Sequence, residues 1–187
     1  MEIVEAQHTD FELFFSYLKD QLSENGVGDV PLFQPLPKGQ CDVSQDLKLR
    51  FLQGNEVDQS DAAWRKLWLA KDESGRIKGH IDLRRHGDDS CLHRVLLGMG
   101  VHHSCRKQGV GSKLIEVVSQ FCTTSQTIDW IDLCVLSDNL PALNLYLKNG
   151  FVVIGEVTDQ YRIDGESISE TMMAKPIHQI HKSQAVT

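Results

Sequence analysis

Residues Val101–Ser112, with the sequence VHHSCRKQGVGS, link the end of an apolar segment to the start of a helical pattern through a short basic turn. The apolar segment before them predicts a strand over Cys91–Val101. The apolar residues after them recur at helical spacing, at Val110, Leu114, Val117, Val118 and Phe121. The first amides of a helix have no internal acceptor, and the helix dipole favours negative charge at that end. We therefore expect this turn to bind a diphosphate.

The residue types in the turn suit that ligand. Gly109 and Gly111 would let phosphate oxygens approach the backbone without meeting a Cβ, and Arg106 and Lys107 add positive charge at the rim. The spacing R-x-x-G-x-G differs from the dinucleotide motif G-x-G-x-x-G and from the P-loop G-x-x-x-x-G-K-[ST]. Taken alone, it also fits a helix that opens with glycine after a solvated basic turn.

The elements before this turn predict an antiparallel meander. Strands are expected over Lys66–Ala70 and Ile77–Arg85, and short turns join them to each other and to Cys91–Val101. Nearer the N-terminus, the pattern predicts a strand over residues 1–6, a helix from Thr9 or Asp10 to Gly26, a proline-containing loop and a short helix over residues 44–54.

After the turn, the run Ile128–Leu136 predicts a buried central strand. Leucines at 140, 143 and 147 predict the buried stripe of another helix, which Asn149-Gly150 would end. Two further strands are expected over 151–157 and 169–175. The prediction is one α/β domain of residues 1–177, with a mixed, largely antiparallel central sheet of six to seven strands flanked by about four helices, followed by a polar tail over 178–187.

Composition excludes several classes of protein. The 187 residues carry a formal net charge of −7, which does not suit binding through phosphate neutralisation of nucleic acid. No apolar run approaches the ~20 residues of a membrane helix, and the acidic N-terminus is unlike a signal peptide. The five cysteines contain no C-x-x-C, and Cys122 and Cys134 lie in apolar segments, as buried cysteines of a reducing compartment do. We expect a cytoplasmic monomer or homodimer without nucleic-acid or membrane partners.

A second motif lies roughly 30 residues after the turn. Residues Asn139–Phe151 follow the pattern N-x-x-A-x-x-x-Y-x-x-x-G-F, which places Asn139, Ala142 and Tyr146 on one face of a helix. By themselves, Asn139 could be a helix cap and Tyr146 a core aromatic residue. Together, the two motifs resemble those of the GNAT superfamily of acetyl-CoA-dependent N-acetyltransferases. The C-terminal residues 155–175 are similar to the branch that contains spermidine, amino-acid and ribosomal-protein N-terminal acetyltransferases.

The resemblance implies a fold and a set of roles. The strand that ends at Val101 and the strand over 131–136 would separate, and pantetheine would enter the gap and pair with the backbone near Met99 and Val101. Asn139 would contact the pantetheine region, and Tyr146 would protonate the departing CoA thiolate. The acetyl-CoA-binding residues so implied are Met99, Val101, Arg106, Lys107, Gln108, Gly109, Val110, Gly111, Ser112 and Asn139.

The sequence leaves the general base open. Residues 92–101 contain no carboxylate, and Asp129, Asp132 and His80 are candidates that could equally be ordinary polar or packed residues. We expect no metal site: nine residues of strand would place His93 and His102 roughly 30 Å apart. Because no carboxylate lies between His102 and Ile115, the acidic charge lies elsewhere in the sequence, and part of it is expected to face the acceptor.

The leading hypothesis is acetyl transfer from acetyl-CoA to a primary amine of a small molecule, by direct attack on the thioester. Two alternatives stay open. The missing base would suit an acyl-CoA-binding regulatory module without transferase activity, and the acceptor could instead be a protein N-terminus or a lysine. The region 26–59 would help to wall the acceptor site, and it matches no specific subfamily.

Overall fold

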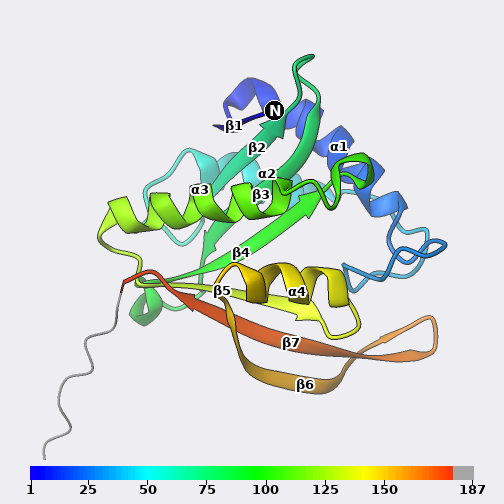
Figure 1. Cartoon of the computed structure of the whole chain (residues 1–187). Coiled ribbons are helices and arrows are strands. Elements are labelled where there is room, and N and C mark those ends of the chain that lie inside the picture. The colour runs from blue at the N-terminus through cyan, green and yellow to red at the C-terminus, as the bar shows by residue number, and fades with distance from the viewer. Residues whose placement is uncertain (179–187) are drawn as a thin grey trace, which may run out of the picture.

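The computed structural model describes residues 1–178, and its centre is a seven-stranded sheet in the order β1-β2-β3-β4-β5-β7-β6 (Figure 1). The strands are β1 (Glu2–Glu5), β2 (Arg65–Lys71), β3 (Ile77–Arg85), β4 (Arg94–Val101), β5 (Trp130–Leu136), β6 (Val152–Ile163) and β7 (Glu166–Pro176). The helices are α1 (Phe11–Ser23), α2 (Gln45–Asn55), α3 (Val110–Ser125) and α4 (Leu140–Lys148). The predicted α/β fold with a mixed, largely antiparallel sheet is confirmed.

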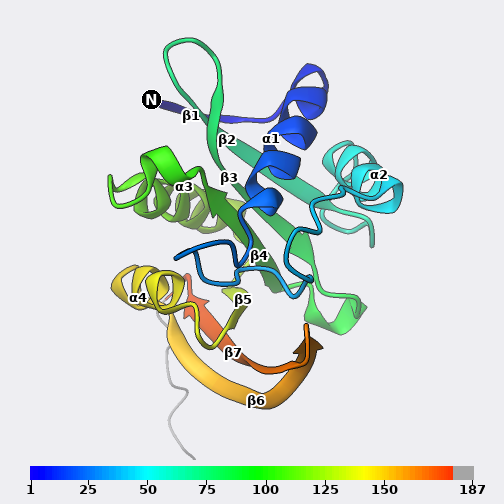
Figure 2. The ribbon, with the colours of Figure 1, turned by 90° about the vertical axis from the view of Figure 1, so that its right-hand side faces the viewer.

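The helices lie on both faces of the sheet, with α1 and α2 on one and α3 on the other (Figure 2). On the α3 face, the side chains of Val110 and Leu114 pack directly over Gly79 of β3. On the opposite face, Phe14 of α1 and Phe51 of α2 make an edge-to-face contact at 4.9 Å between ring centroids, above Leu67 of β2. Each face therefore has its own apolar cluster.

Strands β4 and β5 form the one parallel pair of the sheet, and they separate part-way along. They pair only at Arg94–Trp130, Val95–Ile131 and Leu96–Asp132, whereas β5 pairs with β7 along its whole length. Beyond Leu96 and Asp132 the sheet is open between β4 and β5. This is the gap that the resemblance implied.

Two strand boundaries differ from the prediction. The strand expected over Cys91–Val101 begins only at Arg94, because Asp88 caps a 3₁₀ turn over Asp89–Cys91 by accepting a hydrogen bond from the Ser90 amide. Strands β6 and β7 are longer than predicted, since a tight turn joins them in which both Asp164 (φ 51°) and Gly165 (φ 85°) are left-handed.

The predicted leucine stripe of α4 is wrong. Leu140 and Leu147 are 62% and 50% exposed, and the buried side chain of this helix is Tyr146. The contact between Tyr146 and Phe151, 5.5 Å between ring centroids, turns the Ala142–Tyr146 side of α4 toward the core. Three leucines of equal hydropathy could not predict that rotation.

Two more expectations can be compared with the structure. Cys122 is buried as predicted, but Cys134 is exposed, because it lies where β4 no longer covers the edge of β5. Apart from His178, the tail predicted over 178–187 lies outside the described residues. In residues 1–178, no helix has the length and apolar character needed to cross a membrane.

Candidate functional site

The turn between β4 and α3 has the backbone of an anion site. A 3₁₀ turn over His103–Cys105 leads to two left-handed residues, Lys107 (φ 60°) and Gly109 (φ 81°), and α3 starts directly after them. The first backbone bond of α3 runs from the Lys113 amide to the Gly109 carbonyl, at 3.1 Å. The amides of residues 110–112 therefore have no acceptor within the helix and can bind an anion.

The two glycines of the turn have different structural roles. A Cβ on Gly109 would meet no atom within 4 Å, so this residue leaves open space above the turn, as predicted for phosphate approach. A Cβ on Gly111 would lie 2.8 Å from Leu145 Cδ2 of α4 and 3.5 Å from Met99 Cε of β4. Gly111 therefore lets α3 pack closely against the tip of the Leu145 side chain, a role that the motif alone does not reveal.

Carboxylates from α1 reach the basic turn, which the sequence analysis missed. Arg106 donates from Nε to the Val101 carbonyl (3.2 Å) and from Nη2 to Glu24 (3.0 Å), and His103 pairs with the same carboxylate. Asp20 lies 3.6 Å from the Nε2 of His102. Arg106 thus ties the turn to the C-terminal end of α1 and to β4, and its positive charge is paired with Glu24. Asp20 of α1 and Glu24, the residue that caps the C-terminus of this helix, are four positions apart, which is the signal that could have placed them on one surface.

The exposed backbone of β4 points into the gap. The His102 amide donates a hydrogen bond to the Lys78 carbonyl (2.9 Å). Because hydrogen-bonded pairs alternate along antiparallel strands, the backbone N–H and C=O groups of Gly100 and Gly98 also face β3. The alternate residues Met99 and Val101 direct their N–H and C=O groups away from β3, toward the opening. The Val101 carbonyl accepts from Arg106, whereas the Met99 backbone faces the gap without β5 opposite it.

Helix α4 brings the second motif to the same place. The side-chain oxygen of Asn139 caps the helix by accepting from the Ala142 amide (3.3 Å), as its alternative interpretation predicted. Tyr146 is 8% exposed, burial raises its pKa, and no residue between 1 and 178 hydrogen-bonds to its hydroxyl. Asn149 donates to Ser112 Oγ (3.1 Å), which joins the end of α4 to the start of α3. The two motifs therefore meet across the gap.

Comparisons with known proteins agree with this geometry. The sequence model of the acetyltransferase (GNAT) domain matches residues 63–153. This segment is therefore similar in sequence to a GNAT acetyltransferase domain. It contains β2, β3, β4, α3, β5 and α4, which are the elements that form the gap and the turn.

Two curated relatives share part of the GNAT domain. The L-amino acid N-acetyltransferase of Escherichia coli is 28% identical over 101 residues, which are 54% of this chain and 62% of the relative. The catalytic subunit of the N-terminal acetyltransferase A complex from Arabidopsis thaliana is 27% identical over 100 residues, 54% of this chain and 52% of the relative. The chain thus spans little more than half the length of these relatives.

Solved structures share the whole fold. A GNAT-family acetyltransferase from Streptococcus pneumoniae superposes with a TM-score of 0.76 at 21% identity, covering 95% of this chain and 99% of the other. A GNAT phosphinothricin acetyltransferase from Sinorhizobium meliloti, solved in complex with AcCoA, superposes with a TM-score of 0.75 at 14% identity, covering 94% and 87%. Because the sequence identities are only 21% and 14%, these superpositions show that the chains have the same fold.

Two candidates for the general base lie in surroundings that do not favour that role. His80 is buried between Phe14 and Tyr17, and burial lowers its pKa to about 4. Asp132 forms ion pairs with Arg94 and with His86. Asp129 is exposed and directly precedes β5. It therefore lies at the end where β4 and β5 are paired, away from the gap between them. Within the described chain, no group of three or more His, Cys, Asp or Glu side chains could hold a metal ion.

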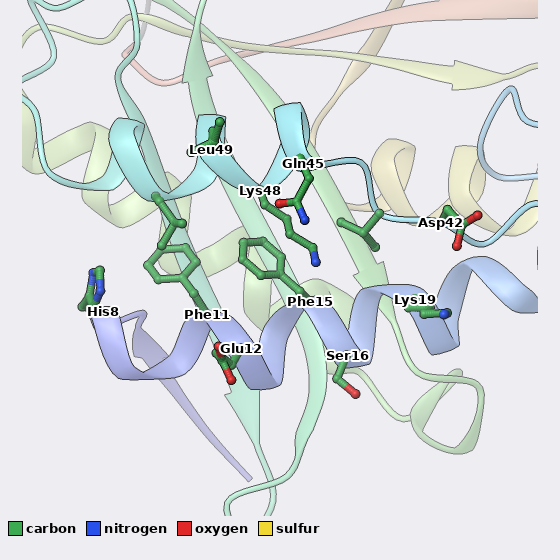
Figure 3. A pocket seen from close by; sticks show the side chains of 12 residues that line it. His8, Phe11, Glu12, Phe15, Ser16, Lys19, Asp42, Gln45, Lys48 and Leu49 are labelled. Atoms are coloured by element: carbon green, nitrogen blue, oxygen red, sulfur yellow. The ribbon is translucent and has the colours of Figure 1, made fainter.

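Two surface grooves flank this site without containing it. The larger, of about 690 Å³, lies between α1 and α2 and is lined by Phe11, Phe15 and Leu49, with the Lys48 ammonium 5.7 Å from the centre of the Phe15 ring (Figure 3). None of the predicted site residues lines it. A second groove of about 550 Å³ begins at Ser112 and continues along α3 to Lys175.

Proposed function

We propose that this chain transfers an acetyl group from acetyl-CoA to a primary amine, by direct attack of the neutral amine on the thioester. The observation that carries the proposal is the meeting of the open α3 N-terminus with the gap between β4 and β5. Two relatives named for acetylation of L-amino acids and of protein N-termini support an amine acceptor, and a fold neighbour solved with AcCoA supports the donor.

In this proposal, the residues of the two motifs divide the binding of the donor. The amides of residues 110–112 and the dipole of α3 hold the diphosphate. The backbone of Met99 pairs with the pantetheine arm in the way that an added strand pairs with a sheet edge. The donor itself supplies an activated acetyl thioester. Holding both reactants in the gap makes the attack effectively intramolecular.

Tyr146 is the proton donor for the leaving group. As the amine nitrogen bonds to the acetyl carbon, the carbon–sulfur bond breaks and the thiolate takes the phenolic proton. The proton that the amine loses returns to the phenolate through solvent, so the products are an amide and a free thiol, and Tyr146 is protonated again. Burial raises the pKa of Tyr146, which keeps the phenol protonated at neutral pH and therefore able to donate.

The test is acetyl-CoA binding followed by thiol release. Wild-type protein should show a saturable thermal shift with acetyl-CoA and should release thiol when a primary amine is added. Absence of acetyl-CoA binding would contradict the proposal. Tight binding without thiol release from any amine would favour the regulatory module instead.

A further inference from the structure

The face of the gap opposite α3 carries polar side chains that the acetyl-CoA site does not use. Ile131, Leu133 and Val135 of β5 belong to the core beneath α3, so Cys134 points to the other face. Cys134 lies two residues beyond the last β4–β5 pair and is exposed, although it is on a central strand. Its exposure marks the opening of the gap on this face.

One side of this opening presents a single carboxylate. Glu170 of β7 pairs with Leu136 of β5, two residues after Cys134, and therefore lies on the same face. Its Oε1 accepts a hydrogen bond from the Tyr161 hydroxyl at 2.9 Å. Burial and then Glu170 raise the pKa of both Tyr161 and Cys134, so both side chains keep their protons. Within residues 1–178, Glu170 has no cationic partner in an ion pair.

A β-bulge positions Tyr161 beside Glu170. Val157 pairs with Glu170 and Tyr161 with Ile168, so four steps along β6 match two along β7. Asp159 within the bulge is left-handed (φ 57°), and its carboxylate bonds to Ser167 and Arg162. Such bulges re-aim side chains. Next to Glu170 the wall is apolar, formed by Leu136, Ile163 and Ile168 with Leu32 from the loop after α1 packed against them.

The other side of the opening carries excess positive charge. Gly98 of β4 lies two residues beyond Leu96, just as Cys134 lies two beyond Asp132. A Cβ on Gly98 would lie 3.1 Å from Arg84 Nη1 and 2.7 Å from Asp82 Oδ1, so these two β3 side chains cover the glycine.

The guanidinium groups of Arg65 and Arg84 share the single carboxylate of Asp82. Arg65 Nε is 2.8 Å from Asp82, whereas Arg84 Nη1 is 3.4 Å from it. Asp82 is 3% exposed and Arg84 38% exposed, so Arg84 presents the unbalanced charge to solvent. The pKa of the Cys134 thiol is raised overall by burial and then by Glu170, and the positive charge of Arg84 offsets part of that rise, so Arg84 and Glu170 both act on this thiol.

We propose that the acceptor is a small amine that also carries a carboxylate, as a free amino acid does, with its amino group at Glu170 and its carboxylate at Arg84. This inference rests on the proposed function, because it names the acceptor class of the same reaction. A polyamine would bring a second cation toward Arg84, and a peptide N-terminus would bring an uncharged amide there. In this proposal the acceptor meets one negative charge, on Glu170, and one positive charge, on Arg84, and not the acidic surface that the net charge led us to expect.

The experiment compares L-amino acids with their amides in the thiol-release assay. Wild-type protein should show a kcat/KM roughly 10- to 100-fold higher for an amino acid than for its amide, the factor of one charge-assisted hydrogen bond. Arg84→Gln should bring the two values together, and Arg84→Lys should restore part of the preference. Glu170→Gln should lower kcat/KM for both substrates, since both carry the amino group.

The controls separate this inference from the proposed function. Arg84→Gln leaves Asp82 paired with Arg65, so the variant should fold, and acetyl-CoA binding measured in parallel reports its integrity. Arg76→Gln removes an exposed arginine from the β2–β3 turn and should keep the wild-type preference. Equal rates for acids and amides, a preference for dipeptides or spermidine, or equal loss on both substrates in Arg84→Gln would overturn the inference alone. Failure of every amine to release thiol would overturn the proposed function and this inference with it.

Discussion

Gly111→Ala tests whether the second glycine of the turn is required by packing or by phosphate approach. The added methyl group would lie 2.8 Å from Leu145 Cδ2. Overpacking of this kind costs about 1–3 kcal/mol, and the better helix propensity of alanine returns up to about 1 kcal/mol. The contacted atom is the tip of a flexible leucine side chain that can shift, so we expect the low end of this cost: a net loss of about 0–1 kcal/mol of unfolding free energy, which is a Tm decrease of up to about 4 °C for a chain of this size.

The same substitution should have the opposite sign when Leu145 is shortened. In a Leu145→Ala background the clashing methyl groups are gone, so Gly111→Ala should be neutral or stabilising by up to about 1 kcal/mol. Urea unfolding of the four proteins gives the coupling energy, which should be about 1 kcal/mol. An equal loss of stability in both backgrounds, or weakened acetyl-CoA binding in both, would refute the packing explanation.

Three further predictions follow from buried groups. Tyr146→Phe should keep acetyl-CoA affinity and lower kcat by roughly 10²- to 10⁴-fold, measured by calorimetry and thiol release; an unchanged kcat would remove Tyr146 from the mechanism. The pKa of His80 is about 4 in the folded protein and 6.5 in the unfolded chain, so the unfolded state binds more protons between pH 4 and 6.5. The free energy of unfolding should therefore fall by about 3 kcal/mol as the pH drops from 6.5 to 4. His80→Leu should flatten that part of a pH-stability curve; the same slope in the variant would contradict it. Asn25→Ala should lose about 2–4 kcal/mol in urea unfolding, because buried Asn25 accepts from the amides of residues 33 and 34 and donates to the carbonyls of 34 and 36; a loss below about 0.5 kcal/mol would show that those bonds contribute little.

The parts of the site that are contiguous in sequence were predictable. The open amides after Gly109 and the α4 cap at Asn139 depend on residues within four positions of each other, so local spacing is sufficient. The antiparallel order β2-β3-β4 also followed from the short turns between these strands.

The parts that depend on tertiary contacts were not predictable. Glu24 reaches Arg106 across 82 residues, and Glu170 and Arg84 come from strands far apart in the chain. The role of Gly111 depends on Leu145, which is 34 positions further along the chain. The rotation of α4 depends on the packing of Tyr146 on Phe151, which hydropathy does not encode.

One measurement tests the proposed acetyl transfer most directly. Wild-type protein is titrated with acetyl-CoA, amino acids are then added, and the amount of thiol released is compared with the amount of acetylated product. We expect saturable binding and one thiol for each amide formed. The Gly109→Asp substitution would put a carboxylate into the open space above the α3 amides, so it should weaken acetyl-CoA binding. Unchanged acetyl-CoA affinity in this variant would contradict the diphosphate site. No binding, or thiol release without an acetylated amine, would contradict the proposed acetyl transfer.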